Sequence, residues 1–126
     1  MKYLIDTHAL IFYLEGNPNL PNRVKEIIEN EKCFLSIASL WEIAIKISLD
    51  KIELTTSFED LEVLLAKNNI EVKQIDIKDL SILQSLPFYH RDPFDRLLVA
   101  QAAQENYTLL TKDQSIALYN VATYWK

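Results

Sequence analysis

The sequence has almost no glycine, cysteine or histidine, and these absences exclude several kinds of functional site. Gly16 is the only glycine, so the chain can build neither the glycine-rich dinucleotide fingerprint nor a P-loop, because both need several glycines to bring backbone close to phosphate. The only cysteine is Cys33, which excludes a disulfide framework, and the apolar run Cys33–Leu35 predicts a buried structural thiol. With His8 and His90 as the only histidines, zinc sites built on cysteine and histidine are excluded. A metal site here would be built from carboxylates, which favours Mg²⁺ or Mn²⁺.

Long hydrophobic runs are also missing. The apolar run at the N-terminus stops at Asp6, and the longest uncharged stretch, Gln114–Trp125, is mixed in polarity. It is far short of the ~20 apolar residues of a membrane span. We therefore expect a soluble, cytoplasmic protein without a membrane partner. The formal net charge of −5 argues against a broadly basic nucleic-acid binder, but not against a site that binds phosphate through metal ions.

The length and the pattern of apolar segments predict one domain of the α/β class over residues 1–126. A chain of 126 residues with 49% hydrophobic residues can bury a core without metal or disulfide staples. Short apolar strands are expected at Tyr3–Ile5, Cys33–Ser36, Val72–Ile75, Tyr107–Thr111 and Val121–Thr123. Helices are expected at Thr7–Glu15, after Pro21, after a cap at Ser36 or Ser39, and at Ser57–Asn68, Lys78–Ser85, Pro93–Asn106 and Asp113–Leu118. This alternation is typical of a mainly parallel sheet covered by helices.

Acidic residues follow the predicted strands where a parallel sheet usually binds ligands, outside the carboxyl ends of its strands. Asp6 directly follows the first strand, and Asp113 closely follows the strand Tyr107–Thr111. Glu42 lies about two turns into the helix after the second strand, and Asp95 lies at the start of the long helix. Crowded carboxylates repel one another unless cations neutralise them. Mg²⁺ takes oxygen ligands and bridges to phosphate, a recurring arrangement for phosphodiester hydrolysis.

The same residues also have an ordinary structural interpretation. Asp6 and Asp113 could each cap the helix that follows, and Glu42 stands four residues before Lys46, the spacing of a surface ion pair. Asp92 precedes a proline at the first helical position, which is typical of an N-cap. We therefore assign Asp92 to capping and Asp95 to the metal.

Four segments resemble the signature blocks of the PIN-domain family, and within it the VapC-type toxins of toxin–antitoxin modules. They are Leu4–His8, Ser36–Ile43, Arg91–Ala102 and Leu110–Asp113. The resemblance implies a three-layer α/β/α sandwich that acts as a Mg²⁺- or Mn²⁺-dependent ribonuclease by in-line attack of water, without a covalent intermediate. It implies further that an acidic quartet of Asp6, Glu42, Asp95 and Asp113 is both catalytic and metal-binding.

Within this quartet, the resemblance implies that Asp6 and Asp95 are the principal metal ligands. Glu42 would bind the metal or orient a water, and Asp113 would complete the site directly or through water.

The resemblance also implies supporting residues around the quartet. Thr7 and Thr111 match hydroxyl positions that hold the carboxylates. Four basic residues adjoin quartet members and could bind RNA phosphates or pair with the acids: Arg91, Arg96, Lys46 and Lys112. A general-base role for His8 is unnecessary where a metal is available, and Trp41 is expected in the core.

The implied partners are an RNA substrate and a cognate antitoxin, in a homodimer or a toxin–antitoxin hetero-oligomer. The helices Thr7–Glu15 and Ser57–Asn68 carry more apolar residues than one face needs, which is compatible with an antitoxin groove. Two other functions stay open at this point. One is a catalytically inert domain that binds RNA or protein, and the other is a receiver-type phospho-signalling domain. The receiver interpretation is weakened because Thr7 and His8, rather than a second acid, follow Asp6.

Overall fold

The central feature of the structure is a sheet of five parallel strands. The computed structural model describes all residues from Met1 to Lys126. In chain order its elements are β1 (Lys2–Ile5), α1 (Thr7–Glu15), α2 (Asn22–Asn30), β2 (Lys32–Ser36), α3 (Ile37–Ser48), the 3₁₀ turn η1 (Phe58–Asp60), α4 (Leu61–Lys67), β3 (Ile70–Lys73), α5 (Ile77–Leu83), α6 (Pro93–Glu105), β4 (Thr108–Leu110), the 3₁₀ turn η2 (Ile116–Leu118) and β5 (Ala122–Tyr124). The strand order is β3-β2-β1-β4-β5, and every neighbouring pair is parallel. The predicted α/β class and parallel sheet are confirmed.

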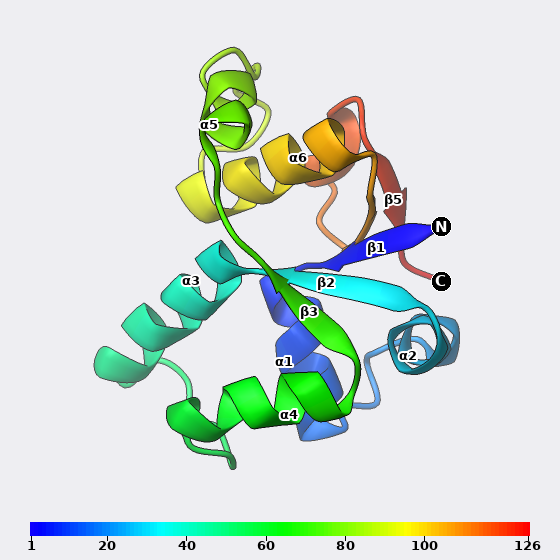
Figure 1. Cartoon of the computed structure of the whole chain (residues 1–126), viewed down its shortest axis with the longest axis vertical. Helices are drawn as coiled ribbons and strands as arrows, with labels where there is room; N and C mark the ends of the chain where they lie inside the picture. The colour runs from blue at the N-terminus through cyan, green and yellow to red at the C-terminus, as the bar shows by residue number, and fades with distance from the viewer.

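Helices cover both faces of the sheet, because alternate strand residues point to opposite sides. Ile5, Leu35 and Leu110 belong to the larger core cluster, which includes side chains of α1, α2, α3 and α4. Their neighbours Leu4 and Leu109 belong to the smaller cluster under α6 and η2. Figure 1 shows α1 to α4 on one side of the sheet and α5 with α6 on the other. The result is the expected α/β/α sandwich.

Most helix boundaries follow from local capping chemistry. The side chain of Ser36 accepts a hydrogen bond from the Ala38 N–H, so Ser36 rather than Ser39 caps α3. Helix α1 ends at Gly16 with φ +63°, a left-handed conformation that glycine adopts without steric cost. Asn106 ends α6 in the same conformation, which asparagine tolerates better than most residues.

Three expectations from the sequence were wrong in detail. Strand β3 spans Ile70–Lys73, earlier than the predicted Val72–Ile75, because it pairs in register from Cys33↔Ile70 to Ser36↔Lys73. The predicted helix Asp113–Leu118 is only the 3₁₀ turn η2. Trp41, expected in the core, is 59% exposed.

Trp41 is exposed because α3 turns a different face to the protein. The buried residues of α3 are Ala38, Ser39, Glu42 and Ile43.

No helix in the structure is both long and apolar enough to span a membrane.

Candidate active site

Strands β1 and β4 bring Asp6 and Thr111 together at the carboxyl edge of the sheet. Ile5 pairs with Leu110, and the Asp6 N–H continues the ladder to the Leu110 carbonyl at 3.2 Å. Asp6 is buried, and its two carboxylate oxygens have different partners. Oδ1 accepts the Ala9 N–H at 3.0 Å as the N-cap of α1, and Oδ2 accepts the Thr111 hydroxyl at 2.5 Å. The capping and the site interpretations of Asp6 are therefore compatible.

A hydrogen bond between two buried hydroxyl groups ties α1 to α3 beside this edge. Thr7 Oγ1 donates to Ser39 Oγ at 2.9 Å, and its hydroxyl forms no hydrogen bond with a carboxylate, contrary to its expected role. Ser39 and Glu42 are one turn apart on the buried face of α3. Glu42 lies near the other acids, because its charge contributes to the raised pKa of Asp95.

Glu42 is buried, and only one of its two carboxylate oxygens has a partner. Its Oε2 forms an ion pair with Lys46 Nζ at 3.0 Å, as the four-residue spacing predicted. Its Oε1 is buried and has no hydrogen-bond partner. A buried carboxylate oxygen without a donor is costly, and it offers an acceptor position to a cation or a water.

The first turn of α6 holds two aspartates with separate tasks. Asp92 Oδ1 accepts the N–H groups of Phe94 at 2.9 Å and Asp95 at 3.0 Å, so Asp92 is the predicted N-cap. Asp95 lies in this first turn, with only 17% of its side chain exposed. Burial raises the pKa of Asp95 to about 7, and the charges of Asp92, Asp6 and Glu42 contribute to this rise. Asp95 therefore lies close enough to three other acids for their charges to affect its pKa.

Asp113 joins this group through a residue that the sequence analysis did not assign. His90 Nε2 lies 3.1 Å from Asp95 Oδ2 and 3.0 Å from Asp113 Oδ2. Burial acts to raise the pKa of Asp113, but hydrogen bonds from the Ile116 N–H, His90 and the Ser115 N–H outweigh it, and the pKa is lowered. Thr111 also links the acids, because its Oγ1 accepts the Asp113 N–H at 3.1 Å.

These contacts place one acidic cluster, Asp6, Glu42, Asp95 and Asp113, at the carboxyl edge of the sheet. Ligand atoms of His90, Asp95 and Asp113 lie within 4.8 Å of one another. The donor set is rich in hard oxygen atoms, and one buried oxygen of Glu42 has no partner. Both properties fit a divalent cation such as Mg²⁺ or Mn²⁺.

Comparison with known proteins identifies the family. The family model described as PIN domain matches residues 3–122. The chain belongs to the PIN domain family. No curated protein sequence matches it.

Solved structures share the fold of this PIN domain at low identity. A chain of VapBC2 from Rickettsia felis, bound to a DNA fragment from its promoter, superposes with a TM-score of 0.74 at 19% identity, covering 100% of both chains. A chain of FitAcB from Neisseria gonorrhoeae gives a TM-score of 0.69 at 18% identity, covering 97% of this chain and 96% of that one. A chain of DNA-bound VapBC from Salmonella typhimurium gives 0.66 at 15% identity, covering 98% and 97%.

The basic residues of this PIN domain differ in how free they are to meet a ligand. Arg91 is exposed beside Asp92. Lys112 is also exposed, with Nζ 5.0 Å from the centre of the Phe12 ring, whereas Lys46 is held by Glu42. Arg96 is buried, so the structure does not bring it to the cluster.

The Arg96 guanidinium donates its hydrogen bonds to groups within the protein. Nη1 donates to the Pro87 carbonyl at 2.9 Å and to the Tyr119 hydroxyl at 3.2 Å. Nη2 donates to the carbonyls of Leu83 and Leu86, both at 3.3 Å. Two roles were expected for Arg96, binding RNA phosphate or pairing with the neighbouring acids. It forms no ion pair with those acids, and its donors are engaged inside this PIN domain, so its role here is structural.

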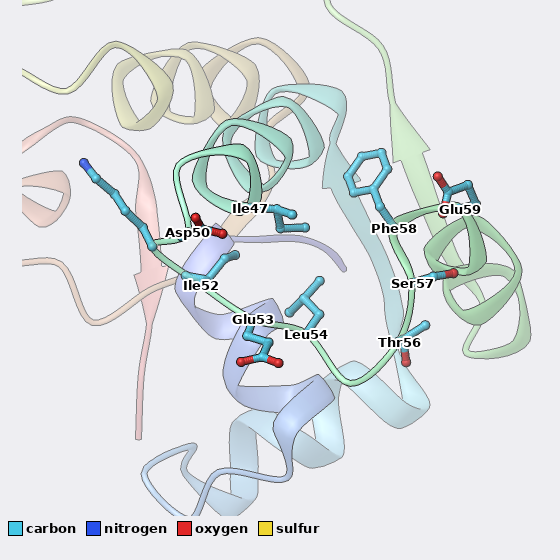
Figure 2. Close-up of a pocket in the computed structure, with 10 residues that line it drawn as sticks. Ile47, Asp50, Ile52, Glu53, Leu54, Thr56, Ser57, Phe58 and Glu59 are labelled. Carbon is cyan, nitrogen blue, oxygen red and sulfur yellow. The ribbon is translucent and has the colours of Figure 1, made fainter.

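Two cavities lie along α3, and none of the four acids of the cluster lines either of them. One, of about 570 Å³, is lined mainly by apolar residues of α3 and α4: Ile37, Leu40, Trp41, Ala44, Phe58, Glu59, Leu61 and Glu62. The second, of about 760 Å³, lies between the end of α3 and the segment that leads to α4. Figure 2 shows Ile47, Ile52 and Leu54 gathered at this second cavity. The two cavities share Phe58 and Glu59, and together we call them the α3 groove.

Proposed function

We propose that this PIN domain is a metal-dependent endoribonuclease, the toxin of a toxin–antitoxin pair. The observation that carries the proposal is the acidic cluster at the carboxyl edge of the sheet, in which Asp6 and Glu42 are buried and Asp95 and Asp113 are partly buried. Four carboxylates from four segments meet there, one with an oxygen that has no partner. Membership of the PIN domain family and the shared fold with VapBC chains support the same activity.

The four acids would hold Mg²⁺ or Mn²⁺. When bound, such an ion makes water a better nucleophile at neutral pH and stabilises the negative charge that grows on the phosphate. The protein's own contribution is to fix the carboxylates. Thr111 orients Asp6 through its hydroxyl, and backbone N–H groups orient Asp113.

The exposed basic residues indicate how the site contacts its substrate. Arg91 and Lys112 are the exposed basic residues beside the cluster, and we assign them to contacts with RNA phosphates. Lys46 limits the negative charge of Glu42 through its ion pair. The Oε1 atom of Glu42 can accept a hydrogen bond from the attacking water, because no protein donor occupies it. We place this activity in the cytoplasm, where the RNA substrate is found.

The test is cleavage of end-labelled structured RNA by the purified chain in Mg²⁺ or Mn²⁺. The comparison proteins are the Asp6→Asn/Asp95→Asn double variant and Asp50→Asn, which removes an exposed acid outside the cluster. We expect cleavage by the unmodified chain and by Asp50→Asn, loss of cleavage in EDTA, and no cleavage by the double variant. Equal cleavage by every preparation would reveal a contaminating nuclease. If the unmodified chain binds RNA but never cuts it, the inert-module interpretation is favoured instead.

We propose the α3 groove as the site for the antitoxin. The sequence analysis placed excess apolar residues on α1, but Ile11, Phe12 and Leu14 pack against the core. The most exposed aromatic residue at the groove is Trp41, which is adjacent to Glu42 and in edge contact with Phe94, with ring centroids 5.1 Å apart. An apolar antitoxin segment in this groove would also cover the approach to the acidic cluster.

The expected result for Trp41→Ala is weaker antitoxin binding by at least tenfold, with nuclease activity of the free chain retained. Binding is measured by calorimetry with the antitoxin encoded beside this chain. Unchanged affinity would place the antitoxin elsewhere. Full nuclease activity at antitoxin saturation would exclude an inhibitory partner.

A further inference from the structure

His90 is held at three of its atoms in the loop between α5 and α6. Its backbone N–H donates to the Tyr119 hydroxyl at 3.0 Å. Its ring nitrogen Nδ1 accepts the backbone N–H of Asp92 at 3.1 Å. The other ring nitrogen, Nε2, faces Oδ2 of both Asp95 and Asp113. The ring therefore has a fixed position and orientation in the acidic cluster.

The contact at Nδ1 determines where the ring carries its proton. A nitrogen that accepts a hydrogen bond must present its lone pair, so the neutral ring carries its hydrogen on Nε2. That N–H is then hydrogen-bonded to Asp113 Oδ2 at 3.0 Å, and Asp95 Oδ2 lies 3.1 Å from the same nitrogen. To bind a cation through Nε2, the ring would have to move its hydrogen to Nδ1 and give up the bond from Asp92.

The loop that carries His90 is itself anchored from behind. The Tyr119 hydroxyl donates to the Pro87 carbonyl at 2.6 Å and accepts from Arg96 Nη1 at 3.2 Å. Arg96 is buried, and its guanidinium carbon lies 4.0 Å from the centre of the Phe88 ring. Tyr119 and Arg96 therefore hold the backbone that positions the imidazole.

We infer that His90 is a positioning residue: its Nε2–H holds the Asp113 carboxylate through a hydrogen bond, and its ring keeps the Asp95 carboxylate beside it, so that both are in place for the cation. The inference rests on the proposed function. Asp113 Oδ1 is held by the N–H groups of Ser115 and Ile116, so the bond to Oδ2 completes its orientation. In Asp95, Oδ2 lies 3.1 Å from His90 Nε2, and this polar contact turns Oδ2 toward the imidazole. Its Oδ1, which accepts no hydrogen bond from the protein, is then the oxygen offered to the metal.

The two-histidine composition makes the hydrogen position directly measurable. Long-range ¹H–¹⁵N correlation spectra of the metal-free chain contain only His8 and His90, and His8→Gln assigns them. We expect His90 to be the tautomer with its hydrogen on Nε2, both without metal and in saturating Mg²⁺. A hydrogen on Nδ1 in Mg²⁺ would make Nε2 a direct ligand and overturn the inference. This measurement needs no change at His90.

Metal affinity gives the second test. Mn²⁺ binding is measured by calorimetry for the unmodified chain, His90→Ala, His90→Gln and the control His8→Ala. Loss of a residue that orients a metal ligand costs 10- to 100-fold in affinity, so we expect His90→Ala to bind Mn²⁺ at least about tenfold more weakly. Glutamine places an amide N–H near the position of Nε2, and His90→Gln should stay within about threefold of the unmodified chain. His8 is exposed, so its replacement should leave the affinity unchanged.

The outcomes separate this inference from the proposed function. If the unmodified chain binds Mn²⁺ and His90→Ala binds it equally well, the inference is wrong and the metal site stands. If His90→Gln loses as much affinity as His90→Ala although both stay folded by circular dichroism, donation from this position is not what matters, and the inference fails. If the unmodified chain binds no Mn²⁺, the proposed function fails and the inference fails with it.

Discussion

The backbone N–H of Asp95 donates a hydrogen bond of 3.0 Å to the side chain of Asp92, three residues earlier. One acid thus caps the helix and orients the other. Asp92 Oδ1 accepts two backbone N–H groups, whereas Asp95 Oδ2 lies 3.1 Å from His90 Nε2 and Asp95 Oδ1 accepts no hydrogen bond from the protein. The DP-x-D sequence at the start of α6 therefore places a capping aspartate beside Asp95, whose pKa is raised mainly by burial and further by the charge of Asp92.

Replacement of the two aspartates should separate capping from metal binding. Asp92→Ala should lower the free energy of unfolding by about 1 kcal/mol, the usual cost of losing an N-cap. Asp92→Asn should restore most of it and leave Mn²⁺ affinity within about threefold, whereas Asp95→Asn should lower the affinity more than tenfold. Thermal unfolding and calorimetry measure the two effects. If Asp92→Asn abolished Mn²⁺ binding and Asp95→Asn spared it, the assignment would be reversed.

The raised pKa of Asp95 predicts a pH-dependent stability of the metal-free chain. The folded state keeps the Asp95 proton up to about pH 7, while the unfolded state loses it near the ordinary value of 3.8. Unfolding thus becomes easier as the pH rises between these values. The full shift corresponds to about 4 kcal/mol at most. In EDTA, we expect Asp95→Asn to raise the melting temperature by about 5 °C or more at pH 8 and by little at pH 4.5. An equal effect at both pH values would contradict the shift.

Arg96 and Arg91 should differ sharply when each is replaced. Arg96→Leu removes the four hydrogen bonds that the buried guanidinium donates to the carbonyls of Leu83, Leu86 and Pro87 and to the Tyr119 hydroxyl, so we expect a loss of about 3 kcal/mol in stability. Arg91 is exposed, and Arg91→Ala should change stability by no more than about 0.5 kcal/mol while weakening RNA binding. Chemical denaturation and a filter-binding assay with RNA check both parts. If the Arg96→Leu variant were stable but bound RNA weakly, Arg96 would be a substrate-binding residue after all.

Cys33 should be inert in the folded chain. It is fully buried, its Sγ donates to the Ile27 carbonyl at 3.5 Å, and burial raises its pKa to about 12. Because the thiolate is the reactive form, a maleimide should not label the native protein at pH 8. One equivalent should react in guanidinium chloride. Rapid labelling under native conditions would show that the β2 region opens easily.

Local signals in the sequence predicted much of the fold. The helix Thr7–Glu15 and the capping roles of Ser36 and Asp92 depend on hydrogen bonds between residues two to four positions apart. The strands β1 and β2 follow from apolar runs that a parallel sheet buries on both faces. The position of β3 was shifted because its register is set by the neighbouring strand β2, which no local pattern reports.

Sequence by itself determined which acids stand at the ends of strands and helices, because those positions depend on short-range periodicity and capping. Only the tertiary structure decided how they are used. His90 reaches Asp113 across 23 residues of sequence, and Arg96 turns inward because distant carbonyls and Tyr119 accept its donors. Thr7 binds Ser39 instead of a carboxylate. Each of these contacts joins chain segments that only packing brings together. Their contribution to the free energy of folding therefore arises only in the folded protein and is not visible in any local stretch of the sequence.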